Sequence, residues 1–426
     1  MLNLQLIREN PSQVEEQLRS RGETSPPVQE VLRLDEQRRK LLVEVETLRA
    51  RRNEVSRQMR GGASDEVRAE MRQVGERIGQ IETLVSETES QLNTLMLELP
   101  NIPDASVPIG ETEDDFEIVG MWGEPRKIEG AKAHWDLGPA LGLLDFERGV
   151  KLSGTRFYVM RGALANLQRA LIQWMLDVHV REHGYTEVMV PYLLKRDALV
   201  WATQLPRFAG NLYHDDESDL WLIPTAESAL AGLYANEILE MPLPIKMVAY
   251  SACFRKEQFA SGRDTRGIKR GHQFDKVEMF QIVEPGADMT ALDEMVEHAS
   301  DLLRRLELPF RLKALPGVDI SFQAAKTIDI EIWSPGVEEW LEVSSCSTVR
   351  DFQARRANLR FRRERGARPE YPYELNASGL ALPRLMIGIM ENYQQPDGTI
   401  AVPEPLRGYM GGLERIESLS SARRDG

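Results

Sequence analysis

The 426-residue chain is poor in cysteine, because Cys253 and Cys346 are its only two. Two isolated thiols exclude the disulfide framework of a small secreted protein. They also exclude a zinc site built on Cys-x-x-Cys pairs, and we expect no structural zinc. This cysteine usage fits the reducing cytoplasm best, so we expect a cytoplasmic protein.

Long apolar runs and the familiar nucleotide-binding motifs are also missing. No run of about 18 apolar residues occurs, which argues against a membrane span. The first ten residues lack the basic and apolar segments of a signal peptide. Neither Gly-x-x-x-x-Gly-Lys-Ser/Thr nor Gly-x-Gly-x-x-Gly after a strand is found. A phosphate site in this chain must therefore be built from arginines.

Positive charge is in deficit, since the formal net charge is −14. With 42% hydrophobic and 28% charged residues, the composition is that of an ordinary soluble globular protein. The net charge does not suggest a nucleic-acid-binding protein. Phosphate contact requires only a local basic surface, however, so the local distribution of charge decides.

Two heptad runs indicate a long helical hairpin. Apolar residues recur at alternating steps of three and four from Val31 to Met59 and again from Val67 to Leu99. A turn containing Gly61 and Gly62 separates the runs, and Ser64 is a candidate N-cap for the second. The pattern predicts an antiparallel hairpin that extends roughly 50 Å, at about 1.5 Å per residue. The same periodicity would also suit a coiled coil that only joins copies of the chain.

The two halves of the hairpin differ in charge. Residues 33–60 contain nine Arg or Lys against five Asp or Glu, whereas residues 65–99 contain three against eight. A basic helix on an acidic protein is a candidate edge for phosphate contact, although such a run is more often a solvated face.

The chain divides into three parts in this interpretation. Residues 1–105 form a helical domain with a coiled-coil arm at about 28–99, residues 106–130 form an acidic linker, and residues 131–426 form a second domain. The second domain has a strongly apolar helix at 163–179 and strand candidates that follow one another without a regular βαβ rhythm. These are 186–191, 220–224, 246–250, 276–283, 326–333 and 340–344. The pattern favours an α+β fold with a mostly antiparallel sheet flanked by helices.

Candidate functional residues are most concentrated between residues 254 and 278. Phe254-Arg255-Lys256-Glu257 is followed by Gly262-Arg263-Asp264-Thr265-Arg266-Gly267, and then by His272-Gln273-Phe274-Asp275-Lys276-Val277-Glu278. A strand, a Gly/Arg loop and a returning strand place several cations over one pocket. Arginine suits this role because its planar fork grips phosphate oxygens in pairs and keeps its charge.

This segment resembles motif 2 of the class II aminoacyl-tRNA synthetases, and specifically that of bacterial-type seryl-tRNA synthetases. Residues 163–191 resemble motif 1. A further segment resembles motif 3 and begins with Gly379-Leu380-Ala381-Leu382-Pro383-Arg384. It continues into Met390-Glu391-Asn392-Tyr393-Gln394, Val402-Pro403-Glu404 and Tyr409-Met410-Gly411-Gly412. Three stretches are more typical of the serine enzymes: Ile223-Pro224-Thr225-Ala226-Glu227, Glu342-Val343-Ser344-Ser345-Cys346-Ser347 and Asp351-Phe352-Gln353-Ala354-Arg355-Arg356. The resemblance runs essentially end to end and implies a class II catalytic domain behind the helical arm.

The resemblance implies an ATP site and a magnesium site. Arg255 would bind the α-phosphate and Arg384 the γ-phosphate, and these two are the implied catalytic residues. Glu257 would accept from the adenine amino group, and Phe274 would stack on the ring. The complete implied ATP set is Arg255, Lys256, Glu257, Phe274, Glu342, Val343, Ser344, Ser345 and Arg384. Glu342 and Ser345 would hold Mg²⁺, which prefers hard oxygen ligands.

The resemblance also implies a serine site. Thr225 and Glu227 would line the amino-acid pocket and suit the ammonium group, while Glu278 and Ser378 would bind the serine hydroxyl. The implied set is Thr225, Ala226, Glu227, Arg255, Glu278, Asn376 and Ser378. The activity implied is ligation of L-serine to tRNA(Ser) through seryl-adenylate, with tRNA(Sec) as a possible further substrate.

In this family the helical arm grips the long variable arm of the tRNA, and a homodimer is implied because the arm of one subunit serves tRNA held by the other. The candidate arm contacts are Arg38, Arg39, Lys40, Arg49 and Arg52. Recognition of RNA by shape and backbone is physically reasonable.

Some positions depart from the family pattern. Trp201-Ala202-Thr203 stands where a glycine-rich triplet is common, Gln258-Phe259 stands where Ala-Gly is usual, and Gly408 replaces a usual proline. Three alternatives therefore stay open: a catalytically altered paralogue, a non-enzymatic scaffold or RNA-binding regulator, and a carrier-protein aminoacyl ligase. Intact Arg255, Glu257, Glu342 and Arg384 favour the synthetase.

Overall fold

The structure is a computed structural model that describes residues 1–58, 64–240, 242–257 and 266–419. It falls into two compact units, Met1–Ile102 and Pro103–Gly426. Among the described helices, none is long and apolar enough to cross a membrane.

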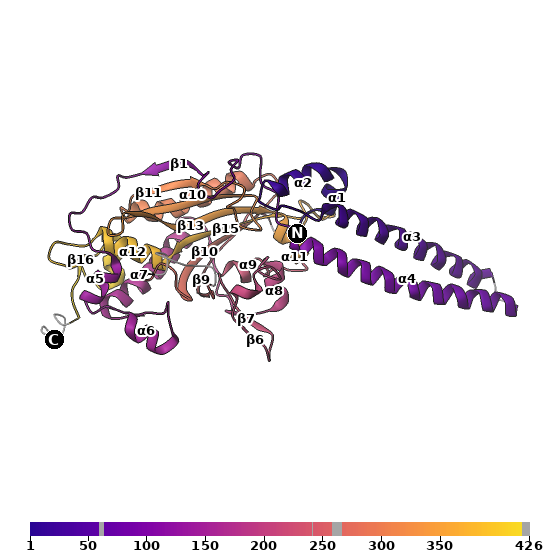
Figure 1. Cartoon of the computed structure of the whole chain (residues 1–426), viewed down its shortest axis with the longest axis horizontal. Helices are drawn as coiled ribbons and strands as arrows, with labels where there is room; N and C mark the ends of the chain where they lie inside the picture. The colour runs from indigo at the N-terminus through magenta and orange to yellow at the C-terminus, as the bar shows by residue number, and fades with distance from the viewer. Residues whose placement is uncertain (59–63, 241, 258–265, 420–426) are drawn as a thin grey trace. The chain divides into compact units, whose positions relative to one another are not determined.

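The first unit is helical. Two short helices, α1 (Leu4–Glu9) and α2 (Pro11–Arg19), precede the long helices α3 (Val28–Gln58) and α4 (Asp65–Glu98), which pack side by side as a hairpin (Figure 1). The predicted hairpin is confirmed. Helix α4 begins at the predicted cap, because the Ser64 hydroxyl accepts a hydrogen bond from the Val67 amide.

Apolar side chains at heptad spacing form the seam of this hairpin, with Val45, Ile78, Ile81 and Leu92 all buried. Thr88 is a buried polar residue of α4, and its hydroxyl donates to the Leu84 carbonyl at 2.7 Å, so that burial leaves no unmade hydrogen bond there.

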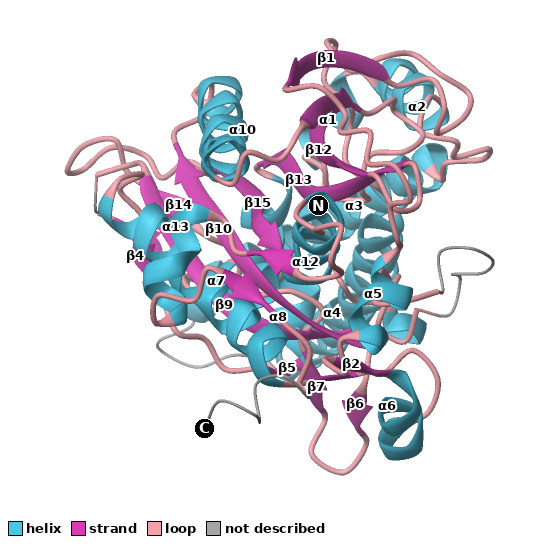
Figure 2. Cartoon of the chain, turned by 90° about the vertical axis from the view of Figure 1, so that its left-hand side faces the viewer, coloured by secondary structure: helices cyan, strands magenta, loops and turns pink. Residues whose placement is uncertain are grey.

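The second unit is built on an eight-stranded sheet with the order β1-β11-β12-β13-β15-β10-β9-β4 (Figure 2). The strands are β1 (Glu117–Trp122), β4 (Thr186–Glu187), β9 (Ile245–Phe254), β10 (Gln273–Val283), β11 (Phe310–Ala314), β12 (Lys326–Ser334), β13 (Glu339–Arg350) and β15 (Tyr373–Ala381). Neighbours are antiparallel except β4 and β9, which are parallel. The predicted α+β fold with a mostly antiparallel sheet is confirmed.

Helices and short strands surround this sheet. The helices are α5 (His134–Ala140), α6 (Phe146–Ser153), α7 (Gly162–Arg181), α8 (Arg196–Trp201), α9 (Glu227–Leu230), α10 (Asp288–Arg305), α11 (Phe352–Ala357), α12 (Leu382–Asn392) and α13 (Glu404–Arg407). The short strands are β2 (Leu144–Asp145), β3 (Val159–Met160), β5 (Leu193–Lys195), β6 (His214–Asp215), β7 (Leu220–Leu222), β8 (Ile238–Leu239), β14 (Arg360–Phe361), β16 (Ile400–Ala401) and β17 (Arg415–Ile416).

The two faces of the sheet have different roles, which strand β10 illustrates. Val277 and Met279 point into the main apolar core, which α7, α10 and α12 complete. Phe280 and Ile282 point to the opposite face, where α8, α9 and α11 form a second core. Because side chains alternate along a strand, Phe274, Lys276 and Glu278 share that second face.

Two features of this unit differ from the sequence interpretation. Part of the predicted linker 106–130 belongs to the sheet, because β1 pairs with β11 at one edge. The central strand β15 was missed, since Glu374, Asn376, Ser378 and Gly379 give it few of the residues typical of strands. Pairing with β10 and β13 on either side imposes the extended conformation.

Candidate active site

A pocket of about 600 Å³ opens on the second face of the sheet, within the second unit. Its walls are formed by residues from β10, β13 and β15, from the ends of β9 and the start of α12, and from loops around α9. Eleven of the sequence-predicted site residues line it: Thr225, Glu227, Arg255, Glu257, Phe274, Glu278, Glu342, Ser345, Asn376, Ser378 and Arg384. Residues as far apart in the sequence as Gln204 and Arg384 are thus brought to one place by the central strands.

Arg255 stands at the end of β9, beside Phe274. Its guanidinium carbon lies 5.1 Å from the centre of the Phe274 ring, and its Nε donates to the Pro224 carbonyl at 3.2 Å. Both residues line the pocket. A flat ring next to a fixed cation suits a nucleotide, whose base stacks and whose phosphates carry negative charge.

Arg384 lies in the first turn of α12, which begins at Leu382 and has Pro383 as its second residue. Its guanidinium donates to the Glu342 backbone carbonyl at 2.8 Å and lies 3.0 Å from the Glu342 carboxylate. Burial acts to raise the pKa of Glu342, but Arg384, with help from Arg255 and Arg270, outweighs it and holds that pKa below its usual value. Glu342 therefore stays ionised at neutral pH.

A second group of lining residues consists of acidic and amide side chains. Glu278 forms an ion pair with Lys276 at 2.5 Å, and both are buried. Glu227 accepts from Gln353 at 2.8 Å and from Gln323 at 3.3 Å. Burial, followed by the nearby Glu278 carboxylate, raises the pKa of Glu227 to about 7. A cation that enters the pocket would therefore favour the ionised form of the Glu227 carboxyl.

Four predicted residues do not line the pocket. Ala226 and Val343 are fully buried, and Val343 belongs to the main core. Ser344 is also buried, and its hydroxyl donates to the Ser378 carbonyl at 2.6 Å, which ties β13 to β15. The Lys256 ammonium lies 5.7 Å from the Tyr213 ring. None of these four, of which Lys256, Val343 and Ser344 were expected for ATP and Ala226 for serine, is among the lining residues.

Other lining residues were missed by the sequence analysis. The basic ones are Lys269, Arg270 and Lys276, and the rest include Gln204, Phe208, Phe322 and Gln323. Lys276 lay in the segment that the analysis singled out, and its alternation with Glu278 on β10 was the signal that could have identified it. Gln258 and Phe259, two departures from the family pattern, lie outside the described residues.

The histidines gather more than their scatter along the sequence suggests. His179 near the end of α7 and His183 just beyond it have a His-x-x-x-His spacing that the sequence analysis overlooked, and their Nδ1 atoms lie 2.9 Å apart. His298 stacks on His183 with ring centroids 4.2 Å apart. Among the described residues, no group of three or more His, Cys, Asp or Glu side chains could hold a metal ion.

The predicted arm residues of the first unit lie along α3, mostly in ion pairs. Arg38 and Arg39 contact the buried Asp35 at 3.6 and 3.2 Å. Lys40 pairs with Glu36 and Arg49 with Glu82, each at 2.7 Å, and Arg52 is exposed. Exposed pairs of this kind contribute only about 0–1 kcal/mol each, so a phosphate group can compete for the cations.

Comparison with known proteins identifies the family. The model of the seryl-tRNA synthetase N-terminal domain matches residues 1–103, and that of the class II tRNA synthetase core domain (G, H, P, S and T) matches residues 209–393. The serine–tRNA ligase of Thermomicrobium roseum is 54% identical over 422 residues, covering 98% of this chain and 95% of that protein. The chain belongs to the seryl-tRNA synthetase family. As a seryl-tRNA synthetase, it is an ATP-dependent aminoacyl-tRNA synthetase.

Further relatives agree with this assignment. The serine–tRNA ligase of Chloroflexus aurantiacus is 54% identical over 98% of this chain and 100% of its own length. The crystal structure of seryl-tRNA synthetase from Pyrococcus horikoshii complexed with ATP has a TM-score of 0.92 at 37% identity, covering 98% of this chain and all of that one. A structure of A. aeolicus tRNASec in complex with M. kandleri SerRS shares the fold, with a TM-score of 0.57 at 16% identity. A non-enzymatic scaffold and a carrier-protein ligase are no longer needed to explain the sequence.

Proposed function

We propose that this seryl-tRNA synthetase activates L-serine as seryl-adenylate in the pocket described above and then transfers it to tRNA(Ser). The observation that carries the proposal is one pocket lined by two groups of residues. Arg255 lies close to Phe274 and, with Arg384, acts on Glu342, whereas Glu227 lies close to Glu278. The first group suits a nucleoside triphosphate and the second suits a small cationic, hydroxylated amino acid.

In the first step, the serine carboxylate attacks the α-phosphorus of ATP, the bond to the bridging oxygen breaks, and pyrophosphate leaves. This chemistry needs positioning and charge stabilisation more than it needs a general base. We assign Arg255 to the α-phosphate and Arg384 to the γ-phosphate, with Phe274 against the adenine ring. Glu257 lines the same pocket and would accept from the adenine amino group.

We assign Glu342 and Ser345 to a magnesium ion, and the residues present fit such an ion. Both side chains supply hard oxygen atoms to the same pocket. Because Arg384 and its neighbours hold the pKa of Glu342 below its usual value, that side chain is a charged carboxylate. A Mg²⁺ ion held there would supply positive charge to the phosphates.

For serine we assign the ammonium group to Thr225 and Glu227 and the hydroxyl to Glu278 and Ser378, with Asn376 nearby. A buried group that hydrogen-bonds the hydroxyl discriminates strongly against alanine, because alanine leaves that group unpaired. The ion pair of Glu278 with Lys276 holds the carboxylate in place. Threonine must be excluded by size.

In the second step, the 2′ or 3′ hydroxyl of the terminal tRNA adenosine attacks the carbonyl carbon of seryl-adenylate, and AMP leaves. We propose that the first unit, residues 1–105 with its arm, binds the variable arm of tRNA(Ser) through the cations of α3. We propose tRNA(Sec) as a second substrate, since recognition by shape and backbone does not depend on the anticodon. We further propose that the protein is a homodimer and that it acts in the cytoplasm, where tRNA is present.

Serine-dependent exchange of pyrophosphate into ATP tests the first step, with threonine, alanine and glycine assayed in parallel. We expect exchange with serine alone. Transfer to tRNA(Ser) and tRNA(Sec) transcripts tests the second step, and light scattering of the purified protein tests the dimer. Absence of exchange with every amino acid, in a folded protein, would sink the proposed chemistry.

A further inference from the structure

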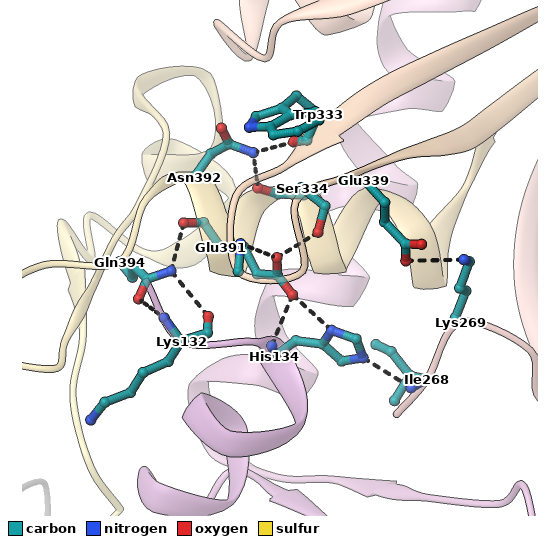
Figure 3. Close-up of polar contacts among 12 residues, drawn as sticks. Lys132, His134, Ile268, Lys269, Trp333, Ser334, Glu339, Glu391, Asn392 and Gln394 are labelled. Atoms are coloured by element: carbon teal, nitrogen blue, oxygen red, sulfur yellow. Dashed lines mark hydrogen bonds and ion pairs between the residues drawn. The ribbon is translucent and has the colours of Figure 1, made fainter. Parts of the chain in front are cut away.

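The segment Met390-Glu391-Asn392-Tyr393-Gln394, at the end of α12, has no role in the function assigned so far. Glu391 is fully buried, and its carboxylate accepts four hydrogen bonds (Figure 3). Oε1 accepts from the backbone N–H and from Nδ1 of His134, each at 2.9 Å. Oε2 accepts from the Ser334 hydroxyl at 2.5 Å and the Gly336 amide at 2.9 Å. One carboxylate thus joins α12 to two other segments.

The other nitrogen of His134 has a partner of its own. The backbone N–H of Ile268 donates to His134 Nε2 at 3.2 Å, and both residues are buried. An N–H group can donate only to a ring nitrogen that carries no proton. Nε2 is therefore the acceptor. The ring proton resides on Nδ1, and this N–H group donates a hydrogen bond to Glu391. The carboxylate fixes the tautomer and the orientation of the ring, and the ring holds Ile268.

Neighbouring residues strengthen this contact. Gly267 has a φ of +74°, and a Cβ atom there would lie 2.0 Å from His134 Nε2, so the ring occupies the space of a side chain. Arg266 lies over the Trp135 ring, 4.6 Å from its centre, and 4.0 Å from Asp136. Three consecutive residues at the start of α5 thus hold three consecutive residues of the segment 266–268.

The residues that follow this segment reach the active-site pocket. Lys269 and Arg270 both line it. Lys269 pairs with Glu339 at 3.0 Å, and Arg270 lies 3.6 Å from the carboxylate of Glu257. Arg384, which we assign to the γ-phosphate, stands at the other end of α12 from Glu391. The bonds in Figure 3 therefore connect the helix that carries one pocket cation to the segment that carries two more.

We propose that His134, oriented by Glu391, is a positioning residue for ATP. By holding Ile268 it keeps Lys269 and Arg270 in register with Arg384, so that the three cations meet one triphosphate. This inference rests on the proposed adenylation chemistry. It assigns His134 no contact with substrate, and it predicts an effect on ATP that exceeds the effect on serine.

Three variants test the proposal in the exchange assay. In His134→Asn the amide nitrogen stands near the position of Nδ1 and keeps the bond to Glu391, but no acceptor remains for Ile268. We expect the KM for ATP to rise about tenfold, the change that loss of one buried hydrogen bond produces, with the KM for serine nearly unchanged. His134→Gln offers an amide oxygen near the position of Nε2 and is expected to restore most of the affinity for ATP. Ser334→Ala, the matched control, removes a different bond to the same carboxylate and leaves the KM for ATP unchanged.

Amide hydrogen exchange of residues 266–271, measured without substrates, supplies a second readout. It should accelerate in His134→Asn and stay as in the wild type in Ser334→Ala. If His134→Asn fails to fold, Gly267→Ala displaces the same contact from the other side and is expected to raise the KM for ATP. An unchanged KM for ATP, or an equal rise in Ser334→Ala, overturns the inference. Lack of exchange activity in the wild type refutes the proposed function instead, and hydrogen exchange then still reports on the His134–Ile268 contact.

Discussion

Glu342 and Ser345 lie three positions apart on β13, yet both line the same pocket. In a regular strand, residues three apart point to opposite faces. Here Ser344 pairs with Ile330 and Glu342 pairs with Glu331, the next residue of β12, so that Val343 has no partner. This β-bulge shifts the alternation of side chains by one residue and places both side chains on one wall of the pocket.

We expect Glu342 and Ser345 to determine the Mg²⁺ concentration that the enzyme needs. Replacing Glu342 by Gln removes the charged ligand, and the Mg²⁺ concentration that gives half-maximal pyrophosphate exchange should rise about tenfold, as losses of ligands or their partners typically produce. Ser345→Ala should cause a smaller rise. The exposed Glu338→Gln, in the turn before β13, serves as the control. An unchanged magnesium dependence in Glu342→Gln would contradict the assignment.

The pKa of Glu227, raised to about 7, predicts a pH dependence. Below pH 7 the carboxyl is neutral, and above it the carboxylate is charged and attracts the ammonium group of serine. The value of kcat/KM for serine should therefore rise as the pH increases through about 7, because this ratio reports the free enzyme. Glu227→Gln should flatten that limb and lower the plateau. A wild-type profile that is flat from pH 6 to 8 would argue against this role.

The buried histidines His179 and His298 are expected to make the free energy of unfolding decrease at acidic pH. Burial, and then His183, lower the pKa of His179 to about 3, and burial, again with His183, lowers that of His298 to about 4. The unfolded chain binds these protons near pH 6.5, so stability is complete above that pH and falls as the pH drops toward 3. His179 alone contributes a slope of roughly 1.4 kcal/mol per pH unit in this window.

Urea denaturation between pH 4 and 7 measures that slope. His179→Gln is expected to reduce the dependence on pH, whatever its effect on stability at neutral pH. An equally steep decline in the variant would mean that other groups control acid unfolding.

The positive charges on α3 should affect tRNA binding and should leave the formation of seryl-adenylate unchanged. Arg49→Ala combined with Arg52→Ala is expected to raise the KM for tRNA(Ser) about tenfold and to lower the salt slope of binding by roughly one to two. Arg77→Ala, on the acidic helix α4 and paired with Glu44, is the matched control. Loss of pyrophosphate exchange in the double variant would show damage to the fold instead of lost tRNA contact.

Thr203, one of the departures from the family pattern, is buried and has a φ of +64°. A β-branched residue is strained in this region, and glycine is not. We expect Thr203→Gly to stabilise the protein by about 1 kcal/mol, measured as a higher Tm. Thr203→Ala, which keeps a Cβ atom, should not. A lower Tm for Thr203→Gly would indicate that the Thr203 hydroxyl, which donates to Ala202 at 2.6 Å, matters more than the strain.

The sequence by itself determined the features that depend on neighbours along the chain. The heptads on either side of Gly61 and Gly62 specify two helices, Ser64 caps the second, and the ordered motifs identify the family. Arg255, Phe274 and Arg384 could be named for the same reason, because their segments are recognisable wherever the chain carries them.

Tertiary structure alone decided how those residues meet. The bulge at Val343 depends on register with β12, and the polar strand β15 is extended because β10 and β13 hold both its edges. The bond between His134 and Ile268 joins residues 134 positions apart. No local propensity specifies such contacts, since their free energy comes from hydrogen bonds and packing that exist only once the sheet and α12 are assembled.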